Sequence, residues 1–62
     1  MGKLKELREE RNITQEDIAI ACGVSRSTIA MIEIGQNKPS LELAMKLAEV
    51  LNISLDKLLR GE

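Results

Sequence analysis

Two helical patterns in the middle of the chain stand only two residues apart, and this spacing restricts the fold more than any other feature. The stretch 15–22 repeats apolar residues at helical spacing and stops at Gly23, and Ser25 then offers a side chain that favours a helix start. Glycine readily adopts the left-handed conformation that ends a helix, and Ala19 is small enough to lie where two helices cross closely. The sequence therefore predicts a helix-turn-helix.

The apolar residues of this segment indicate how the two helices pack together. They are Ile18, Ala19, Cys22, Val24, Ile29 and Ile32, and Gly35 ends the second helix. Another kind of helical hairpin would share part of this pattern. The small residue, the glycine and the apolar spacing together favour the helix-turn-helix.

A further helix is expected before this pair. Leu4, Leu7 and then Ile13 fit one face of it, charged residues alternate elsewhere, and it ends near residues 11–12.

Two more helices are expected after the pair. Pro39 bars a helix, and Ser40 can start the next one, which runs to residue 51. Its inward face consists of Leu41, Ala44, Leu47, Ala48 and Leu51. Asn52 is suited to end this helix, and Ser54 to cap a short last helix at 55–60.

The sequence thus predicts an all-α fold of five short helices, with no strands, repeats or linkers. A chain of 62 residues has room for one domain, which we expect to span residues 1–62. So small a core leaves little room for a catalytic cleft.

Several function classes are excluded by what the sequence lacks. It contains no histidine and a single cysteine, Cys22, so we expect no zinc site, other metal or cofactor, no internal disulfide, and a buried structural role for the thiol. Without histidine or a paired nucleophile the chain is not expected to be an enzyme. No apolar run approaches the roughly 18 residues of a membrane span, and the N-terminus lacks a secretory signal, so a cytoplasmic protein without membrane contact is expected.

The overall charge gives no support to a nucleic-acid partner. Nine basic and ten acidic residues leave a net charge of −1, whereas domains that grip phosphates are usually basic. A DNA-binding function must therefore depend on where the charges and helix N-termini lie.

The second helix of the pair has an outer face that suits a DNA groove. That face consists of Arg26, Ser27, Ala30, Met31 and Ile34. Ser27 and Ala30 are small enough to let the helix approach base edges, and Arg26 can bind guanine through two hydrogen bonds. Ala30 and Met31 suit contact with thymine methyl groups.

These residues lie within a longer stretch with a clear resemblance. The segments LKELREERNITQEDIA and GVSRSTIAMIEIGQNKPSLELAMKLAEVLNISLDKLL resemble, over nearly the whole chain, the DNA-binding domains of the Cro and lambda-repressor type, also called the Xre family. The resemblance implies a five-helix lambda-repressor-like bundle, whose helices 2 and 3 form the helix-turn-helix, and operator binding as a dimer.

The resemblance also implies roles for individual residues. It places base contacts at Arg26, Ser27, Ala30 and Met31, and phosphate contacts at Gln15, Thr28, Asn37 and Lys38. It pairs Arg8 with Glu33 as an architectural ion pair, and it places the dimer contact near Leu55, Lys57 and Leu59. Gln15 would in addition hold in position the first of these base-contact residues, Arg26.

Each assignment has an alternative that the residues leave open. Arg26 and Lys38 could be ordinary solvated charges, and Gln15 could simply begin a helix. Met31 could fold back on the edge of the core, and Leu59 could belong to the core. Ile34 departs from the family pattern, because a polar residue usually precedes this glycine and an isoleucine cannot bind phosphate.

The resulting hypothesis is a prokaryotic or phage transcriptional regulator, a repressor, that binds a pseudo-palindromic operator as a homodimer with helix 3 in the major groove. The alternative is a protein-protein interaction module of the same fold, such as one that meets an antirepressor or another partner protein. The acidic balance and the apolar Ile34 suit this alternative.

Overall fold

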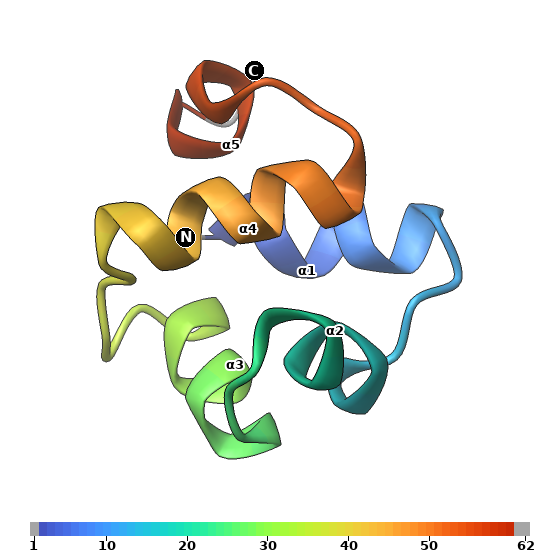
Figure 1. The fold of residues 1–62 in the computed structure, drawn as a ribbon, viewed down its shortest axis with the longest axis vertical. Coiled ribbons are helices and arrows are strands. Elements are labelled where there is room, and N and C mark those ends of the chain that lie inside the picture. The colour runs from blue at the N-terminus through green and yellow to red at the C-terminus, as the bar shows by residue number, and fades with distance from the viewer. Residues whose placement is uncertain (1, 61–62) are drawn as a thin grey trace.

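The computed structural model describes residues 2–60 and contains five helices and no strand in that range. They are α1 (Gly2–Glu10), α2 (Gln15–Cys22), α3 (Arg26–Glu33), α4 (Leu41–Leu51) and α5 (Leu55–Arg60). Figure 1 shows α4 crossing the middle of the molecule, with α5 on one side of it, α2 and α3 on the other, and α1 running behind it. The all-α fold of five helices is confirmed.

Short polar side chains begin four of the helices, as the sequence predicts. Thr14, Ser25 and Ser40 each accept a hydrogen bond from the backbone N–H three residues later, and Ser54 does the same for Lys57. Each bond satisfies one of the N–H groups that a helix start leaves without a partner.

Left-handed residues end the helices that must turn sharply. Gly23 ends α2 at a φ of 72°, which lets α3 begin after only Val24 and Ser25. Asn52 ends α4 at a φ of 57°, a conformation that asparagine tolerates better than most residues. The tight turn between α2 and α3 follows from the left-handed conformation of Gly23.

One apolar core joins all five helices. It consists of Leu4, Leu7, Ile18, Ala19, Cys22, Ile29, Ile32, Leu47, Ala48, Leu51 and Leu58. Within it α2 packs against both α3 and α4, and α5 packs against α4. The helix-turn-helix is therefore fixed on its inner side by α4, which leaves the outer side of α3 free of the core.

Two sequence predictions about apolar residues were wrong. Leu41, assigned to the inward face of α4, is 66% exposed, and its neighbour Leu43 packs against the core instead. Ile13 lies after the end of α1 rather than on its face, although it still packs against the core. In both cases the residue stands at or beyond a helix end, where helical spacing no longer determines what lies opposite.

The side chain of Arg11 links the C-terminal ends of α1 and α4. Arg11 donates from Nε to the carbonyl oxygen of Leu51 at 2.6 Å and from Nη1 to that of Leu7 at 3.0 Å. Carbonyls at a helix end lack partners within the helix, so Arg11 satisfies one in each of two helices. None of the helices described in residues 2–60 is long and apolar enough to cross a membrane.

Candidate nucleic-acid interface

The two sides of α3 differ as the sequence predicts. Ile29 and Ile32 are buried in the core, whereas Arg26 and Ser27 are exposed at the start of the helix. Ala30 and Met31 are half-buried, so part of each side chain faces solvent beside Arg26. The side chains on the outer side of α3 are thus mostly small or half-buried, and one long cationic side chain, that of Arg26, lies at its N-terminal end.

The charges around α3 differ in sign from those of the whole chain. Between residues 24 and 41 the only charged side chains are Arg26, Glu33 and Lys38. Arg26 and Lys38 are exposed, whereas the side chain of Glu33 is 5% exposed and is paired with Arg8. The exposed charges of α3 and its following loop are therefore positive, in a chain whose net charge is −1.

Arg8 and Glu33 form an ion pair between α1 and α3. Nε of Arg8 lies 2.8 Å from Oε2 of Glu33, and Nη2 lies 3.4 Å from Oε1. Nη1 of Arg8 also donates to the carbonyl oxygen of Ile13 at 2.8 Å. Burial by itself would raise the pKa of Glu33, but hydrogen bonds from Arg8 and Gln15 and the charge of Arg8 outweigh it, so the pKa lies below its ordinary value.

Gln15, the first residue of α2, connects this ion pair to Arg26 at the start of α3. Its Nε2 donates to Oε1 of Glu33 at 2.9 Å, and its Oε1 accepts from Nη1 of Arg26 at 3.4 Å. The side chain therefore lies between the end of α3 and its beginning, and it does more than begin a helix.

A shallow pocket of about 410 Å³ opens beside this arrangement. It is lined by Arg8, Thr14, Gln15, Glu16 and Arg26. The lining carries Arg8 and Arg26 but also the carboxylate of exposed Glu16, and Arg8 is already paired with Glu33. Binding of an anion here would depend on Arg26 and on the backbone N–H groups at the N-terminus of α2, which lack partners within the helix.

The loop after α3 holds the remaining predicted phosphate contacts. Asn37 and Lys38 are exposed, and the N–H groups of Gln36 and Asn37 bind the carbonyl oxygen of Met31 at 2.9 and 3.3 Å. The loop is therefore tied to the end of α3 while its side chains extend into solvent. Ile34 ends the helix and is 67% exposed.

The predicted dimer residues lie on α5 in different environments. Leu55 packs partly against the core, whereas Lys57 and Leu59 are exposed. Leu59 is 57% exposed, so the alternative that it belongs to the core is wrong, and Leu58 takes that place.

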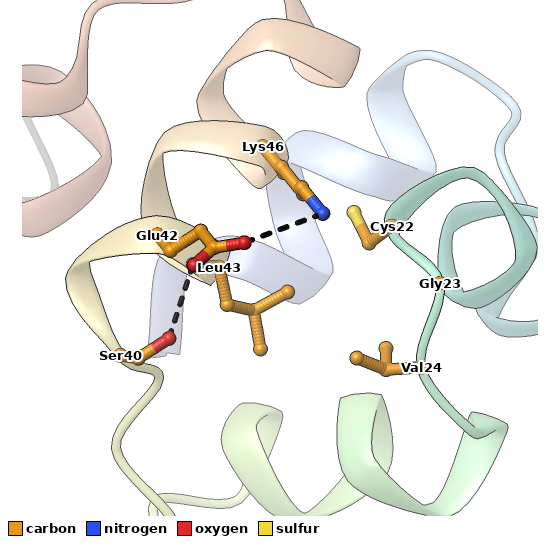
Figure 2. Close-up of a pocket in the computed structure, with 7 residues that line it drawn as sticks. All are labelled: Cys22, Gly23, Val24, Ser40, Glu42, Leu43 and Lys46. Carbon is orange, nitrogen blue, oxygen red and sulfur yellow. Dashed lines mark hydrogen bonds and ion pairs between the residues drawn. The ribbon is translucent and has the colours of Figure 1, made fainter.

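A second pocket lies away from the residues assigned to DNA. It has a volume of about 300 Å³ and is lined by Cys22, Gly23, Val24, Ser40, Glu42, Leu43 and Lys46, as Figure 2 shows. Burial raises the pKa of the Cys22 thiol, against a smaller opposing effect of the charge on Lys46, so the neutral form is favoured. Lys46 instead lies 3.8 Å from the carboxylate of Glu42. Among residues 2–60 no three acidic, cysteine or histidine side chains gather in a way that could hold a metal ion.

A family model described as helix-turn-helix matches residues 4–58 of the sequence. The chain belongs to the helix-turn-helix family. The resemblance to the Cro and lambda-repressor type is thereby confirmed, and α2 and α3 are the helices that give the family its name.

Relatives and solved structures agree with this assignment. An uncharacterised HTH-type transcriptional regulator of Methanocaldococcus jannaschii is 47% identical over 55 residues, which cover 89% of this chain and 83% of the relative. The restriction-modification controller protein C.AhdI from Aeromonas hydrophila superimposes with a TM-score of 0.86 at 38% identity, over 92% of this chain and 88% of that one. SinR, the master regulator for biofilm formation, solved in complex with DNA, gives a TM-score of 0.84 at 32% identity over 94% and 95% of the two chains.

One feature of this helix-turn-helix was not predicted from the sequence. The bond between Gln15 and Glu33 joins residues 18 positions apart, and it depends on how α2 and α3 cross. Helical spacing describes each helix separately, so it gave no signal for this contact. The resemblance offered Gln15 as a brace for the recognition helix and Glu33 as a partner of Arg8, without connecting the two.

Proposed function

We propose that this helix-turn-helix protein is a sequence-specific DNA-binding transcriptional regulator that places α3 in the major groove of an operator. The observation that carries the proposal is the exposed positive charge around α3. Arg26 and Lys38 extend into solvent, and the only acidic residue between positions 24 and 41 has a buried side chain that Arg8 neutralises. Phosphates therefore meet no exposed carboxylate along α3 and its loop.

Base reading falls to the outer side of α3. Arg26 has the reach and donor geometry to bind guanine through two hydrogen bonds, which contribute about 1–3 kcal/mol of discrimination. Ser27 is exposed and small enough to allow a close approach to the bases. Ala30 and Met31 keep part of their surface exposed for the methyl groups of thymine.

Phosphate contacts flank the bases on both sides. Gln15, Arg26 and the backbone N–H groups at the start of α2 supply donors for one phosphate, against the opposing charge of Glu16, which lines the same pocket. Asn37 and Lys38 are exposed on the loop beyond α3 and suit another. Thr28 is half-buried, and its hydroxyl lies 2.9 Å from that of Ser25, so a phosphate contact from Thr28 would form at the helix start.

The protein acts as a homodimer in this proposal. One recognition helix is too small to specify an operator, and two that are about 34 Å apart match successive turns of one face of DNA. Leu55, Lys57 and Leu59 of α5 supply the contact, with exposed Leu59 as its apolar centre. The proposed effect on transcription is repression, in which a dimer bound over a promoter blocks the access of polymerase.

A second candidate is a protein-protein interaction module that meets an antirepressor or another regulator. It is favoured by Ile34, which is 67% exposed at the end of α3 and cannot bind a phosphate. An apolar partner surface would cover this side chain, whereas DNA would leave it beside the backbone.

Selection from a randomised DNA library separates the two candidates. The proposal expects enrichment of a pseudo-palindromic site whose affinity falls steeply as salt rises, because binding releases counterions from the phosphates. The site's half-sites should lie about one helical turn apart. No enrichment, or an affinity independent of salt, would favour the interaction module.

A further inference from the structure

Four side chains form a continuous chain of hydrogen bonds from buried Arg8 on α1 to exposed Arg26 at the start of α3. Arg8 donates to Glu33, Gln15 donates to the other oxygen of Glu33, and Arg26 donates to Gln15. The distances between the bonded atoms are 2.8, 2.9 and 3.4 Å in that order. A buried group at the end of α3 thus contacts, through one residue, the exposed arginine at its beginning.

The chemistry of the two outer groups fixes how the Gln15 amide is turned. The carboxylate of Glu33 is ionised and can only accept hydrogen bonds, and the guanidinium of Arg26 can only donate them. Gln15 has one face of each kind, so only one orientation satisfies both neighbours. Its NH₂ group must face Glu33, and its carbonyl oxygen must face Arg26.

The side chains of this network are held less tightly toward its exposed end at Arg26. The side chains of Arg8 and Glu33 are 9% and 5% exposed, so neither has room to rotate away. Arg26 is exposed, and its 3.4 Å bond to Gln15 is long for a hydrogen bond. Glu33 therefore holds Gln15 tightly, while Gln15 restrains Arg26 loosely enough for it to reach a base.

We infer that Glu33 is a positioning residue for base recognition, which directs Arg26 toward guanine by holding the carbonyl oxygen of Gln15 on its side. The inference rests on the proposed function, because it requires Arg26 to read a base. It assigns Glu33 a role in specificity although Glu33 itself is buried and touches no DNA. A purely architectural ion pair would hold α1 and α3 in place and leave the choice of base unchanged.

Glu33→Gln tests this because it turns the group that faces Gln15 from an acceptor into a donor. The introduced amide keeps its oxygen toward Nε of Arg8, the shorter of the two Arg8 contacts, and its NH₂ group then faces Gln15 and replaces the acceptor of the weaker, 3.4 Å contact from Nη2 of Arg8. Gln15 must turn its own oxygen inward, which presents NH₂ to the guanidinium of Arg26. Two donor groups then face each other, so Arg26 loses the hydrogen bond to Gln15 that orients its side chain.

Gln15→Met provides a second variant that does not depend on the ion pair. It removes the amide, keeps a side chain of similar length, and leaves Arg8 and Glu33 bonded. Glu49→Gln, which neutralises an exposed carboxylate on α4, is the matched control. Binding of the purified protein is measured to the selected site and to sites with each other base pair at the position that Arg26 reads.

The expected result is a loss of discrimination at that position, accompanied in Gln15→Met by a uniform loss of affinity for all sites, because Gln15 is also a proposed phosphate contact. Glu33→Gln and Gln15→Met should each lower the preference for guanine about 3- to 10-fold, a part of what the whole arginine contact supplies. Neither should lower it further in a protein that already carries Arg26→Ala. Glu49→Gln should keep the wild-type preference.

Other outcomes overturn the inference in distinguishable ways. If Arg26→Ala relaxes one position while Glu33→Gln and Gln15→Met weaken all sites equally, Glu33 is architectural and the proposed function stands. Glu33 is also architectural if the losses persist in the Arg26→Ala background. If Glu33→Gln does not fold, the double variant Arg8→Met with Glu33→Leu takes its place, because it leaves no buried charge unpaired, and an unchanged preference for guanine in that variant overturns the inference. If the wild type selects no sequence, the proposed function and the inference both fail.

Discussion

Arg8 of α1 and Glu33 of α3 form an ion pair with 2.8 Å between Nε and Oε2, and the side chains are 9% and 5% exposed. Burying two charges costs much of what their attraction returns, so such a pair is expected to add little net stability. Removing one partner is a different matter, because the other charge stays buried without compensation.

The first prediction follows from that asymmetry. Arg8→Met should lower the free energy of unfolding by about 3–5 kcal/mol, because it leaves the Glu33 carboxylate unpaired. The double variant Arg8→Met with Glu33→Leu should be more stable than Arg8→Met alone. Urea unfolding followed by circular dichroism measures the wild type, Arg8→Met, Glu33→Leu and the double variant, and a double variant that loses the sum of both single effects would contradict this account.

The second prediction concerns pH. The pKa of Glu33 is lower in the folded protein than in the unfolded chain, so its contribution to stability is present above the ordinary glutamate pKa of about 4.3 and is lost as the pH falls toward the folded value. Glu33→Gln should therefore show a shallower fall in the free energy of unfolding between about pH 5 and pH 3. Glu49→Gln, an exposed position on α4, should keep the wild-type slope.

Much of the fold is predicted by the sequence because its signals are local. Thr14, Ser25, Ser40 and Ser54 cap helices within three residues of themselves, and Gly23 needs only its own backbone freedom to end α2. Such features require no knowledge of distant segments. They explain why the number and order of the helices follow from the pattern of residues.

The errors and omissions arise where distant segments meet. Leu41 has the right angle around α4 to face inward, but spacing does not show whether another element lies opposite the first turn, and there the residue is 66% exposed. The bond from Gln15 to Glu33 depends on the crossing of α2 and α3, and the bond from Arg11 to Leu51 spans 40 residues. The spacing of apolar residues along the sequence gives no information about either hydrogen bond.

The third prediction tests the corrected position of Leu41. Leu41→Glu should change the free energy of unfolding by less than about 0.5 kcal/mol, as an exposed substitution usually does. Leu47→Ala, in the same helix but fully buried, should lower it by about 2–5 kcal/mol because it leaves a cavity in the core. Equal losses for the two variants in thermal or urea unfolding would contradict the structure.

The fourth prediction separates base reading from phosphate binding. Arg26→Ala should relax specificity at one base pair in each half-site, whereas Lys38→Ala should weaken every sequence alike and reduce the salt dependence by about one counterion. Lys46→Ala removes an exposed lysine beside the second pocket and should change neither property. Fluorescence anisotropy at several salt concentrations measures these effects. Equal losses for Arg26→Ala on operator and random DNA would refute its assignment to a base.

The fifth prediction concerns the dimer. Leu59 and Ile20 are both exposed, at 57% and 72%, but only Leu59 lies on α5, where the subunit contact is proposed. Leu59→Asp should shift the protein toward monomers and weaken operator binding at least about tenfold, because one helix-turn-helix can grip only one half-site. Ile20→Asp introduces the same charge on α2 and should leave the association unchanged. Sedimentation equilibrium measures the association, and dimers of undiminished stability for Leu59→Asp would exclude α5 as the contact.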